Sequence, residues 1–436
     1  MKTIKAFAVS LLLCALTIVG LHLYSGRGFS AEGKAGTWVS DAKSQSGSTL
    51  KKMAADENAV LIFGSSELRH GQGSGFHGDT IFDGADMAPI YVGKAGYQSL
   101  THAITLGAVG SQAANKKAVL IVSPQWFKEN GVKSTAFEAA FSEEEYIALL
   151  ENPDISQETK DYINGRLQNI MTDNENMSER VKKAREWYQP KDDNTAEQPG
   201  WLEQKKADFH KILLEEKNNY KVMAEALMDG ISNHRNKESG AKLSQATWEQ
   251  LRKEAETEGH KLSDGNDYGM FDSVYKGTYQ TLIANGKHKN PKYTLDSMEF
   301  SDLECFLSIC REEGIEPLVV ILPFNGYWYD YTELTAEERS TFYEKIRCIA
   351  EDYGVQCADL SGNEYTEYYF EDNSHPALKG LVDLNEAMNF IGKIRQNEKA
   401  VFLGKVIFFY LLLMILWMHF MLAKDSAAPA FIYEQF

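Results

Sequence analysis

The sequence predicts an α/β protein in which a doubly wound parallel sheet carries a helical insertion and stands between two transmembrane helices. Short apolar runs alternate with helical stretches along the chain, a pattern typical of parallel β-α units. A long charged interval with helical periodicity interrupts this alternation. Uncharged apolar segments of membrane-spanning length stand near both ends of the chain.

Composition sets the class of protein. The 436 residues are 43% hydrophobic and 25% charged, which is enough apolar material for one large domain or two ordinary ones. This excludes a disordered, collagen-like or disulfide-dense chain. The formal net charge of −17 argues against a surface that binds nucleic acid by neutralising phosphates.

Residues 1–25 form the predicted N-terminal anchor. The segment from Ala6 to Tyr24 contains no formal charge and is long enough to cross the roughly 30 Å hydrocarbon core as a helix. Lys2 and Lys5 precede it, so the positive-inside rule places the N-terminus in the cytoplasm and the body outside. A cleaved secretory signal is the alternative. We favour a retained anchor because the segment exceeds a usual signal core and no clear A-x-A-like site follows.

Residues 397–436 form a predicted C-terminal membrane helix and tail. The segment from Val406 to Leu422 lies between Lys405 and Lys424 and is almost free of polar residues. A buried helix of a soluble domain would carry a polar face, so we interpret this segment as a membrane helix. One full crossing returns the last residues to the cytoplasm, whereas a re-entrant insertion keeps them outside.

The five cysteines contain no C-x-x-C pattern, so they predict no metal or redox site. One lies in the first membrane segment and four in the exported body: Cys14, then Cys305, Cys310, Cys348 and Cys357. One or two disulfides involving Cys348 or Cys357 fit the sequence, and so does burial as small hydrophobic side chains.

Residues 53–396 form the predicted α/β domain, which follows a Gly, Ser, Ala and Lys-rich tether at residues 26–52. The first strand, Ala59–Phe63, is apolar throughout and is expected to be buried on both faces of the sheet. The later elements are expected, in order, as a strand at Ile90–Val92, a helix at Gln98–Val109, a strand at Ala118–Val122, a helix at Ser301–Glu313, a strand at Pro317–Leu322, a helix at Thr335–Tyr353, a strand at Val355–Leu360 and a helix at Pro376–Ile394.

Residues 142–258 form the predicted helical insertion. The interval is long and charged, has local breaks at prolines, and contains amphipathic stretches such as Trp201 to Met228. We interpret it as an insertion in the α/β core rather than as a separate domain.

Two serines follow the first strand. Loops at the carboxyl ends of parallel strands carry the active site in such folds, and Ser65 and Ser66 stand there, at the expected turn into a helix. Helix N-terminal amides beside a hydroxyl would stabilise developing negative charge. The alternative is that either serine only caps the helix.

Asp372 and His375 follow the last expected strand, immediately before Pro376. An aspartate three residues before a histidine can hold one ring nitrogen while the other nitrogen faces a hydroxyl. A histidine beside a proline can also be an ordinary surface-loop residue. Both motifs belong to the same edge of the predicted sheet, which favours a Ser-His-Asp relay.

These motifs carry a family resemblance. Gly64-Ser65-Ser66 resembles the first block of SGNH hydrolases, with Ser65 in the Asp position of their Gly-Asp-Ser, and Asp372-x-x-His375 matches their last block. The chain more specifically resembles the DltD family, which acts in D-alanyl transfer to teichoic acids. The matching stretches occur in family order and are Phe63–Leu68, Gln98–His102, Ser123–Phe127, Pro323–Asp330 and Asp372–Pro376. The resemblance implies an SGNH/flavodoxin-like fold.

The resemblance also implies roles for individual residues. Ser66 would be the nucleophile, His375 the general base and acid, and Asp372 the residue that orients the histidine. Gly96 would supply a backbone amide to the oxyanion. Where the SGNH pattern has an asparagine, this sequence has Gln125, which would have to be the second donor; one missing donor typically costs ~10²–10³ in rate.

Four residues in the matching stretches are candidates for binding the substrate: Trp126, Asn325, Trp328 and Tyr329. They follow the third and fourth expected strands, so they can line an acceptor groove at the same edge of the sheet. Packing beneath the loops is the alternative role of the aromatic side chains.

The tail from Phe431 to Phe436 resembles the C-terminal end of DltX, a small membrane protein of the same pathway. This resemblance implies that Tyr433 carries the D-alanyl group, because a phenol with a pKa near ~10 is a better leaving group than an alcohol. An interfacial aromatic anchor is the alternative. Transfer to an external serine needs Tyr433 outside or in a shared tunnel, whereas two full crossings leave it in the cytoplasm.

Together these features predict a serine acyltransferase of SGNH-hydrolase type at the cell membrane, with an extracytoplasmic catalytic domain, in D-alanylation of lipoteichoic or wall teichoic acid. An exported esterase or thioesterase and a non-catalytic scaffold are the alternatives. The implied partners are a teichoic acid acceptor, a D-alanyl donor from a carrier protein or membrane intermediate, and a membrane-bound O-acyltransferase. No cofactor, metal ion or nucleic acid is expected.

Overall fold

The computed structural model describes residues 2–83, 85–171, 174–189, 200–231, 243, 246–286, 293–389, 406–407 and 409–414. The chain divides into two units, residues 1–388 and residues 389–436. The first unit contains the sheet and every element discussed below except the short C-terminal helical stretch.

A five-stranded parallel sheet organises the first unit, which confirms the predicted α/β class. The strands are β1 (Ala59–Phe63), β2 (Ala88–Val92), β3 (Lys117–Val122), β4 (Glu316–Ile321) and β5 (Gln356–Asp359). Their order is β2-β1-β3-β4-β5, with every neighbouring pair parallel, which is the flavodoxin-like order. The carboxyl ends of all five strands therefore meet at one edge of the sheet.

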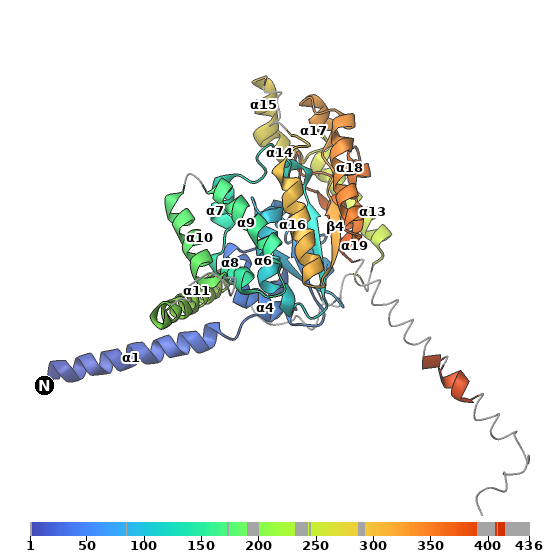
Figure 1. The fold of residues 1–436 in the computed structure, drawn as a ribbon. Coiled ribbons are helices and arrows are strands. Elements are labelled where there is room, and N and C mark those ends of the chain that lie inside the picture. The colour runs from blue at the N-terminus through green and yellow to red at the C-terminus, as the bar shows by residue number, and fades with distance from the viewer. Residues whose placement is uncertain are drawn as a thin grey trace, which may run out of the picture. The chain divides into compact units, whose positions relative to one another are not determined.

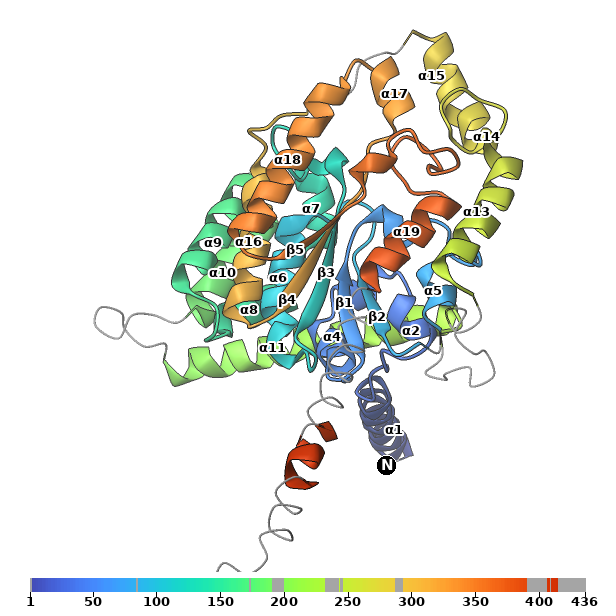
Figure 2. The same cartoon turned by 90° about the vertical axis from the view of Figure 1, so that its right-hand side faces the viewer.

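Helices cover both faces of the sheet (Figures 1 and 2). Three of them, α6 (Ser99–Val109), α16 (Met298–Glu312) and α18 (Ala336–Asp352), belong to one face, and α19 (Leu378–Met388) lies on the other. Right-handed crossovers explain why α6, α16 and α18 share a face, because the crossovers from β2 to β3, β3 to β4 and β4 to β5 run in one direction across the sheet. The crossover from β1 to β2 runs in the other direction, and its helix α5 (Gly78–Ile81) contacts α19.

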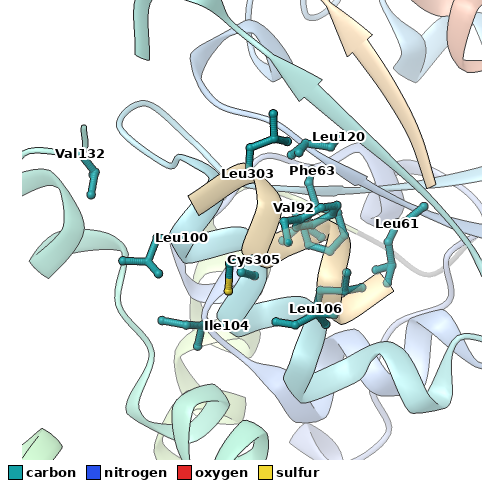
Figure 3. Packing of buried hydrophobic residues seen from close by; sticks show 14 of the residues in the cluster. Leu61, Phe63, Val92, Leu100, Ile104, Leu106, Leu120, Val132, Leu303 and Cys305 are labelled. Carbon is teal, nitrogen blue, oxygen red and sulfur yellow. The ribbon is translucent and has the colours of Figure 1, made fainter. Parts of the chain in front are cut away.

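The main core lies between the sheet and the α6 and α16 layer (Figure 3). Alternate residues of the strands, such as Leu61 and Phe63, point into it and meet Leu106 of α6 and Leu303 of α16. Strands β1 to β4 are buried almost throughout, whereas β5 is partly exposed because it forms an edge. Continuous apolar runs are what strands covered on both faces require.

Strand β2 starts two residues earlier than predicted and includes Pro89. A proline cannot donate a hydrogen bond to a neighbouring strand. Strand β2 tolerates one because it is the other edge strand and pairs with a neighbour, β1, along only one of its edges. The final helix ends at Met388, so the described part is shorter than the predicted Pro376–Ile394.

Between β3 and α16 the described residues are almost entirely helical. The helices are α7 (Ser134–Ala140), α8 (Glu143–Glu151), α9 (Gln157–Ile170), α10 (Glu175–Tyr188), α11 (Trp201–Met228), α13 (Trp248–Ser263), α14 (Asp272–Val274), the π-helical turn η4 (Tyr275–Tyr279) and α15 (Gln280–Ala284). Helix α13 packs against α19, and α8 packs against α6. The segment between β3 and α16 therefore packs on the helical layers of both faces of the sheet.

Residues 26–52 were expected to form a tether, and the structure differs. They contain α2 (Lys34–Thr37), α3 (Asp41–Ser44) and α4 (Gly47–Ala54), and Ala35, Lys43 and Leu50 are fully buried. Gly36 explains why the segment packs so closely: a Cβ there would come within 2.4 Å of the Pro89 carbonyl oxygen. This segment covers the exposed side of the β2 edge.

The remaining short elements connect the sheet. They are the 3-10 turns η1 (Ser66–Leu68), η2 (Gly110–Gln112), η3 (Pro124–Trp126) and η5 (Ser361–Asn363), with helices α5 (Gly78–Ile81) and α17 (Gly326–Tyr331).

Among the described residues one helix is long and apolar enough to cross a membrane. Helix α1 (Lys2–Ser25) contains this span at Ile4–Ser25, and its side chains are exposed. Residues 406–407 and 409–414 are helical. The rest of the predicted C-terminal membrane helix, and Tyr433, lie outside the described residues.

Candidate active site

Ser66 stands at the carboxyl end of β1. Gly64 continues the strand by donating its N–H to the Val92 carbonyl at 3.1 Å, and the chain then turns sharply into η1. A Cβ at Gly64 would lie 2.6 Å from the Glu67 Oε1 atom, so a larger residue there would displace the buried Glu67 side chain. The predicted helix after the serines is a single 3-10 turn, so aligned helix amides contribute little at Ser66.

Asp372 and His375 stand on the loop between β5 and α19. The Asp372 Oδ1 atom accepts the backbone N–H groups of Ser374 and His375, each at 2.8 Å. The other oxygen, Oδ2, lies 2.7 Å from His375 Nδ1. The same carboxylate therefore folds the turn and fixes the plane of the imidazole ring.

Ser66 and His375 meet although they are 309 residues apart. The Ser66 hydroxyl lies 2.7 Å from His375 Nε2, and both side chains are partly buried. Since Nδ1 faces the aspartate, a proton on Nδ1 leaves Nε2 free to accept the serine proton. The three residues that the sequence predicted as a relay are thus joined in the predicted order.

Burial and charge shift the ionisation of this relay. Burial alone would raise the pKa of Asp372, but the hydrogen bond and charge of His375 outweigh it and lower that pKa. Burial alone would lower the pKa of His375, but Asp372 outweighs it and raises that pKa, with help from Glu67 and Glu371. The acid is held as a carboxylate and the histidine becomes a stronger base.

A second histidine and carboxylate lie directly against the first pair. The His70 ring stacks on the His375 ring, with centroids 3.8 Å apart and planes within 12°. His70 Nδ1 lies 2.9 Å from Glu371 Oε2. The sequence motifs did not predict this pair, although His70 stands four residues after Ser66 and Glu371 immediately precedes Asp372.

Glu67 is buried beneath the serine turn. Its Oε1 atom accepts the Ser65 backbone N–H at 2.5 Å, and within the described part of the chain its Oε2 atom has no hydrogen-bond partner. Burial raises its pKa. It also lies close enough to His375 to favour the charged imidazolium.

The two predicted oxyanion donors, Gly96 and Gln125, differ in their position and their contacts. Gly96 has a φ of 92°, which favours glycine, and its backbone N–H donates to Ser65 Oγ at 3.2 Å. Its amide therefore points toward the serine turn. Gln125 is half-buried in η3, at the end of the strand beside β1.

Asn325 is fully buried and supports the loop that carries Asp372 and His375. Its side-chain amide donates to the Asp372 carbonyl at 3.1 Å and to the Tyr268 carbonyl at 2.9 Å, and its Oδ1 accepts the Trp328 backbone N–H. Asn325 therefore holds the loop that carries the relay, which differs from the predicted contact with substrate.

The predicted aromatic residues are buried in this structure. Tyr329 is fully buried, and its hydroxyl accepts a weak bond from the Asn373 side chain at 3.5 Å. Trp328 stacks edge-on against Tyr279, whose hydroxyl donates to Asn373 at 2.8 Å. The geometry favours the packing interpretation, because Tyr279 and Tyr329 hydrogen-bond to Asn373 in the loop of Asp372 and Trp328 packs on Tyr279.

Trp126 is likewise buried, and its ring centroid lies 6.3 Å from that of His102.

All five cysteines are free, two of them deep in the core, so the disulfide interpretation is not supported. The described residues contain no cluster of three or more histidine, cysteine or acidic side chains that could hold a metal ion.

Comparison with known proteins agrees with these motifs. The family model described as DltD protein matches residues 36–391. Protein DltD of Bacillus subtilis (strain 168) is 32% identical over 348 residues, which cover 78% of this chain and 83% of that protein. Protein DltD of Staphylococcus aureus is 26% identical over 331 residues, covering 74% and 78%, and that of Lacticaseibacillus rhamnosus is 25% identical over 361 residues, covering 78% and 79%. This chain therefore belongs to the DltD family.

Proposed function

We propose that this protein is a membrane-anchored serine acyltransferase that transfers D-alanyl groups to teichoic acid outside the cytoplasm. The single observation that carries the proposal is the 2.7 Å approach of the Ser66 hydroxyl to His375 Nε2, with Asp372 on the far side of the ring. Membership of the DltD family supports the choice of D-alanine and teichoic acid.

In the first half-reaction, Ser66 Oγ attacks the carbonyl carbon of an activated D-alanyl ester or thioester. His375 Nε2 takes the hydroxyl proton and then gives it to the leaving oxygen or sulfur. The product is a D-alanyl ester on Ser66. The Gly96 backbone N–H donates to Ser65 Oγ in this structure, so it would have to exchange that hydroxyl for the tetrahedral oxyanion in order to stabilise it.

In the second half-reaction, a hydroxyl of the polyol-phosphate polymer attacks the same carbonyl carbon. His375 takes the proton of that hydroxyl and returns it to Ser66 Oγ, so the enzyme is restored. Each transfer adds an ammonium group to a polyanion. The formal net charge of −17 repels such a polymer, so capture relies on proximity at the membrane or on a local basic surface.

The anchor proposed for this chain is α1. Its span at Ile4–Ser25 carries one lysine, Lys5, at its N-terminal end, and Lys2 precedes it, which by the positive-inside rule places the body outside. The body would then lie on the side of the membrane where teichoic acids are displayed.

Incorporation of labelled D-alanine into teichoic acid tests the proposal. Cells that carry only Ser66→Ala or only His375→Ala should lose incorporation, whereas Ser111→Ala, an exposed serine in η2, should not. Free D-alanine without labelled polymer would indicate an esterase or thioesterase. Full incorporation in both relay variants would leave only a scaffold role.

A further inference from the structure

Helix α11 is fixed to the body along one side. The Tyr188 hydroxyl donates to the Ala207 carbonyl at 2.8 Å, and Asn218 donates to Glu144 at 2.6 Å. Val222 and Ala226 of its second half pack against Trp38. One side of this 28-residue helix therefore packs against the body. These contacts hold α11 in place whether or not anything covers its other side.

The opposite side of α11 carries four exposed apolar side chains, with Lys205 on the same stripe between Leu202 and Phe209. Phe209, Ile212 and Leu213 are 61%, 56% and 50% exposed, and Leu202, seven residues before Phe209, is also exposed. Spacings of three, four and seven place these side chains on one stripe of a helix. We call Leu202, Phe209, Ile212 and Leu213 the α11 apolar face. Contiguous exposed apolar residues of this kind mark a binding surface.

The membrane helix meets α11 on this same side. His22, in the last turn of α1, lies 2.6 Å from Glu216, which is one turn beyond Ile212 and Leu213. At 1.5 Å of rise per residue, Ile212 and Phe209 lie only about 6 and 10 Å along the helix from this contact. Since His22 lies near the outer end of the apolar span, the α11 apolar face stands at the level where α1 leaves the bilayer.

The two helices run across one another. Helix α1 is seen lengthwise in Figure 1 and end-on in Figure 2, whereas α11 is foreshortened in Figure 1 and lengthwise in Figure 2. A helix that crosses a spanning helix in this way can lie in the plane of the membrane surface. The link between α1 and the packed body is also short, because Ala31 is already buried.

We infer that the α11 apolar face lies in the lipid headgroup and acyl boundary beside the anchor, on the side of the membrane where the body stands. The inference rests on the proposed anchor. Two exposed lysines stand at the start of the same helix: Lys205, which lies 3.3 Å from Asp208, and Lys206, whose charge suits the anionic headgroups that such interfacial helices meet. The face and the anchor together hold the body in one orientation on the bilayer.

Depth-dependent quenching in proteoliposomes tests this inference. An environment-sensitive fluorophore is attached to Phe209→Cys, to Leu213→Cys and, as the matched control, to Lys221→Cys, an exposed residue of α11 off the apolar face. The full-length variants carry Cys14→Ala and Cys348→Ser, because those two cysteines are exposed. The vesicles contain phosphatidylcholine and phosphatidylglycerol, with nitroxide-labelled lipid or aqueous iodide as quencher.

Labels at residues 209 and 213 should be quenched severalfold more by nitroxide lipid than the label at residue 221, and should be protected from iodide. Equal iodide quenching at all three positions would overturn the inference. A benzophenone at residue 209 that crosslinks to a protein in native membranes, with no lipid adduct, would also overturn it.

Two further measurements distinguish failure of this inference from failure of the proposed anchor or of the proposed acyl transfer. Loss of the full-length chain from floated vesicles would overturn the anchor and this inference together. The Ser66→Ala variant should give the same quenching pattern as its parent, so a failed acyltransferase proposal would leave the α11 result unchanged.

Discussion

Asp372→Asn tests the relay most directly, because the structure dictates how the new amide must sit. Asp372 Oδ1 accepts two backbone N–H groups, so the asparagine oxygen must stay there. Its NH2 group then faces His375 Nδ1 and donates to it. The ring proton moves to Nε2, which now points a hydrogen at the Ser66 hydroxyl and cannot take its proton.

The free-energy cost of the opposite amide orientation, with the asparagine oxygen facing His375, follows from the same two backbone contacts. Reversing the amide leaves two backbone donors unsatisfied, at about 1–3 kcal/mol each, so the reversed orientation lies about 2–6 kcal/mol higher. That corresponds to a competent population lower by a factor of roughly 30 to more than 10⁴. The imidazolium also loses its carboxylate partner, so we expect the rate to fall by on the order of 10³–10⁴.

Two assays measure this change. One is the initial rate of labelled D-alanine incorporation, and the other is the rate at which a fluorophosphonate labels Ser66. The control is Asp161→Asn, the same substitution at an exposed site on α9, with thermal unfolding checked for both variants. A folded Asp372→Asn protein within about tenfold of the parent rate would refute the tautomer argument.

Three other changes have defined outcomes. Gly96→Ala should lower the thermal unfolding midpoint and slow Ser66 labelling, because φ is 92° and the new Cβ would lie 3.1 Å from the Ala136 Cβ atom; an unchanged midpoint contradicts this. Glu371→Gln removes a negative charge that raises the pKa of His375, so the acidic limb of the pH profile for Ser66 labelling should move to lower pH, and a move to higher pH contradicts this charge argument. Tyr433→Phe should abolish D-alanine incorporation while leaving fluorophosphonate labelling of Ser66 intact if the tail carries the acyl group; incorporation at the parent rate excludes that role.

Local sequence was sufficient for the sheet and for the relay. Strand β1 has the predicted bounds because its five apolar residues can only be buried on both faces, and the residues that end parallel strands must share an edge. Ser66 and His375 meet for that reason. Within the short loop, the Asp372 carboxylate accepts the Ser374 and His375 backbone N–H groups and lies against His375 Nδ1, so residues that are local in sequence orient the ring.

The supporting contacts could not be predicted because they join side chains through tertiary packing. His70 stacks on His375 only because the serine turn and the β5 loop approach each other in three dimensions. Asn325 was expected to contact substrate, yet it is buried and donates to the Asp372 carbonyl. Burial of the predicted tether likewise depends on Gly36 meeting the edge of β2, which no local pattern reveals.

The 309-residue separation between Ser66 and His375 also means that the two side chains can meet only after most of the chain has been synthesised. The serine is made early and the histidine near the end, after every helix of the insertion. If Ser66 is the proposed nucleophile, a nascent or truncated chain has the hydroxyl without its base, so it would neither accept nor release a D-alanyl group during synthesis and folding. Bringing such distant residues together also costs loop-closure entropy, which slows folding. On the proposed mechanism, Ser66 would become a nucleophile only once the C-terminal part of the domain has been synthesised and has folded against it.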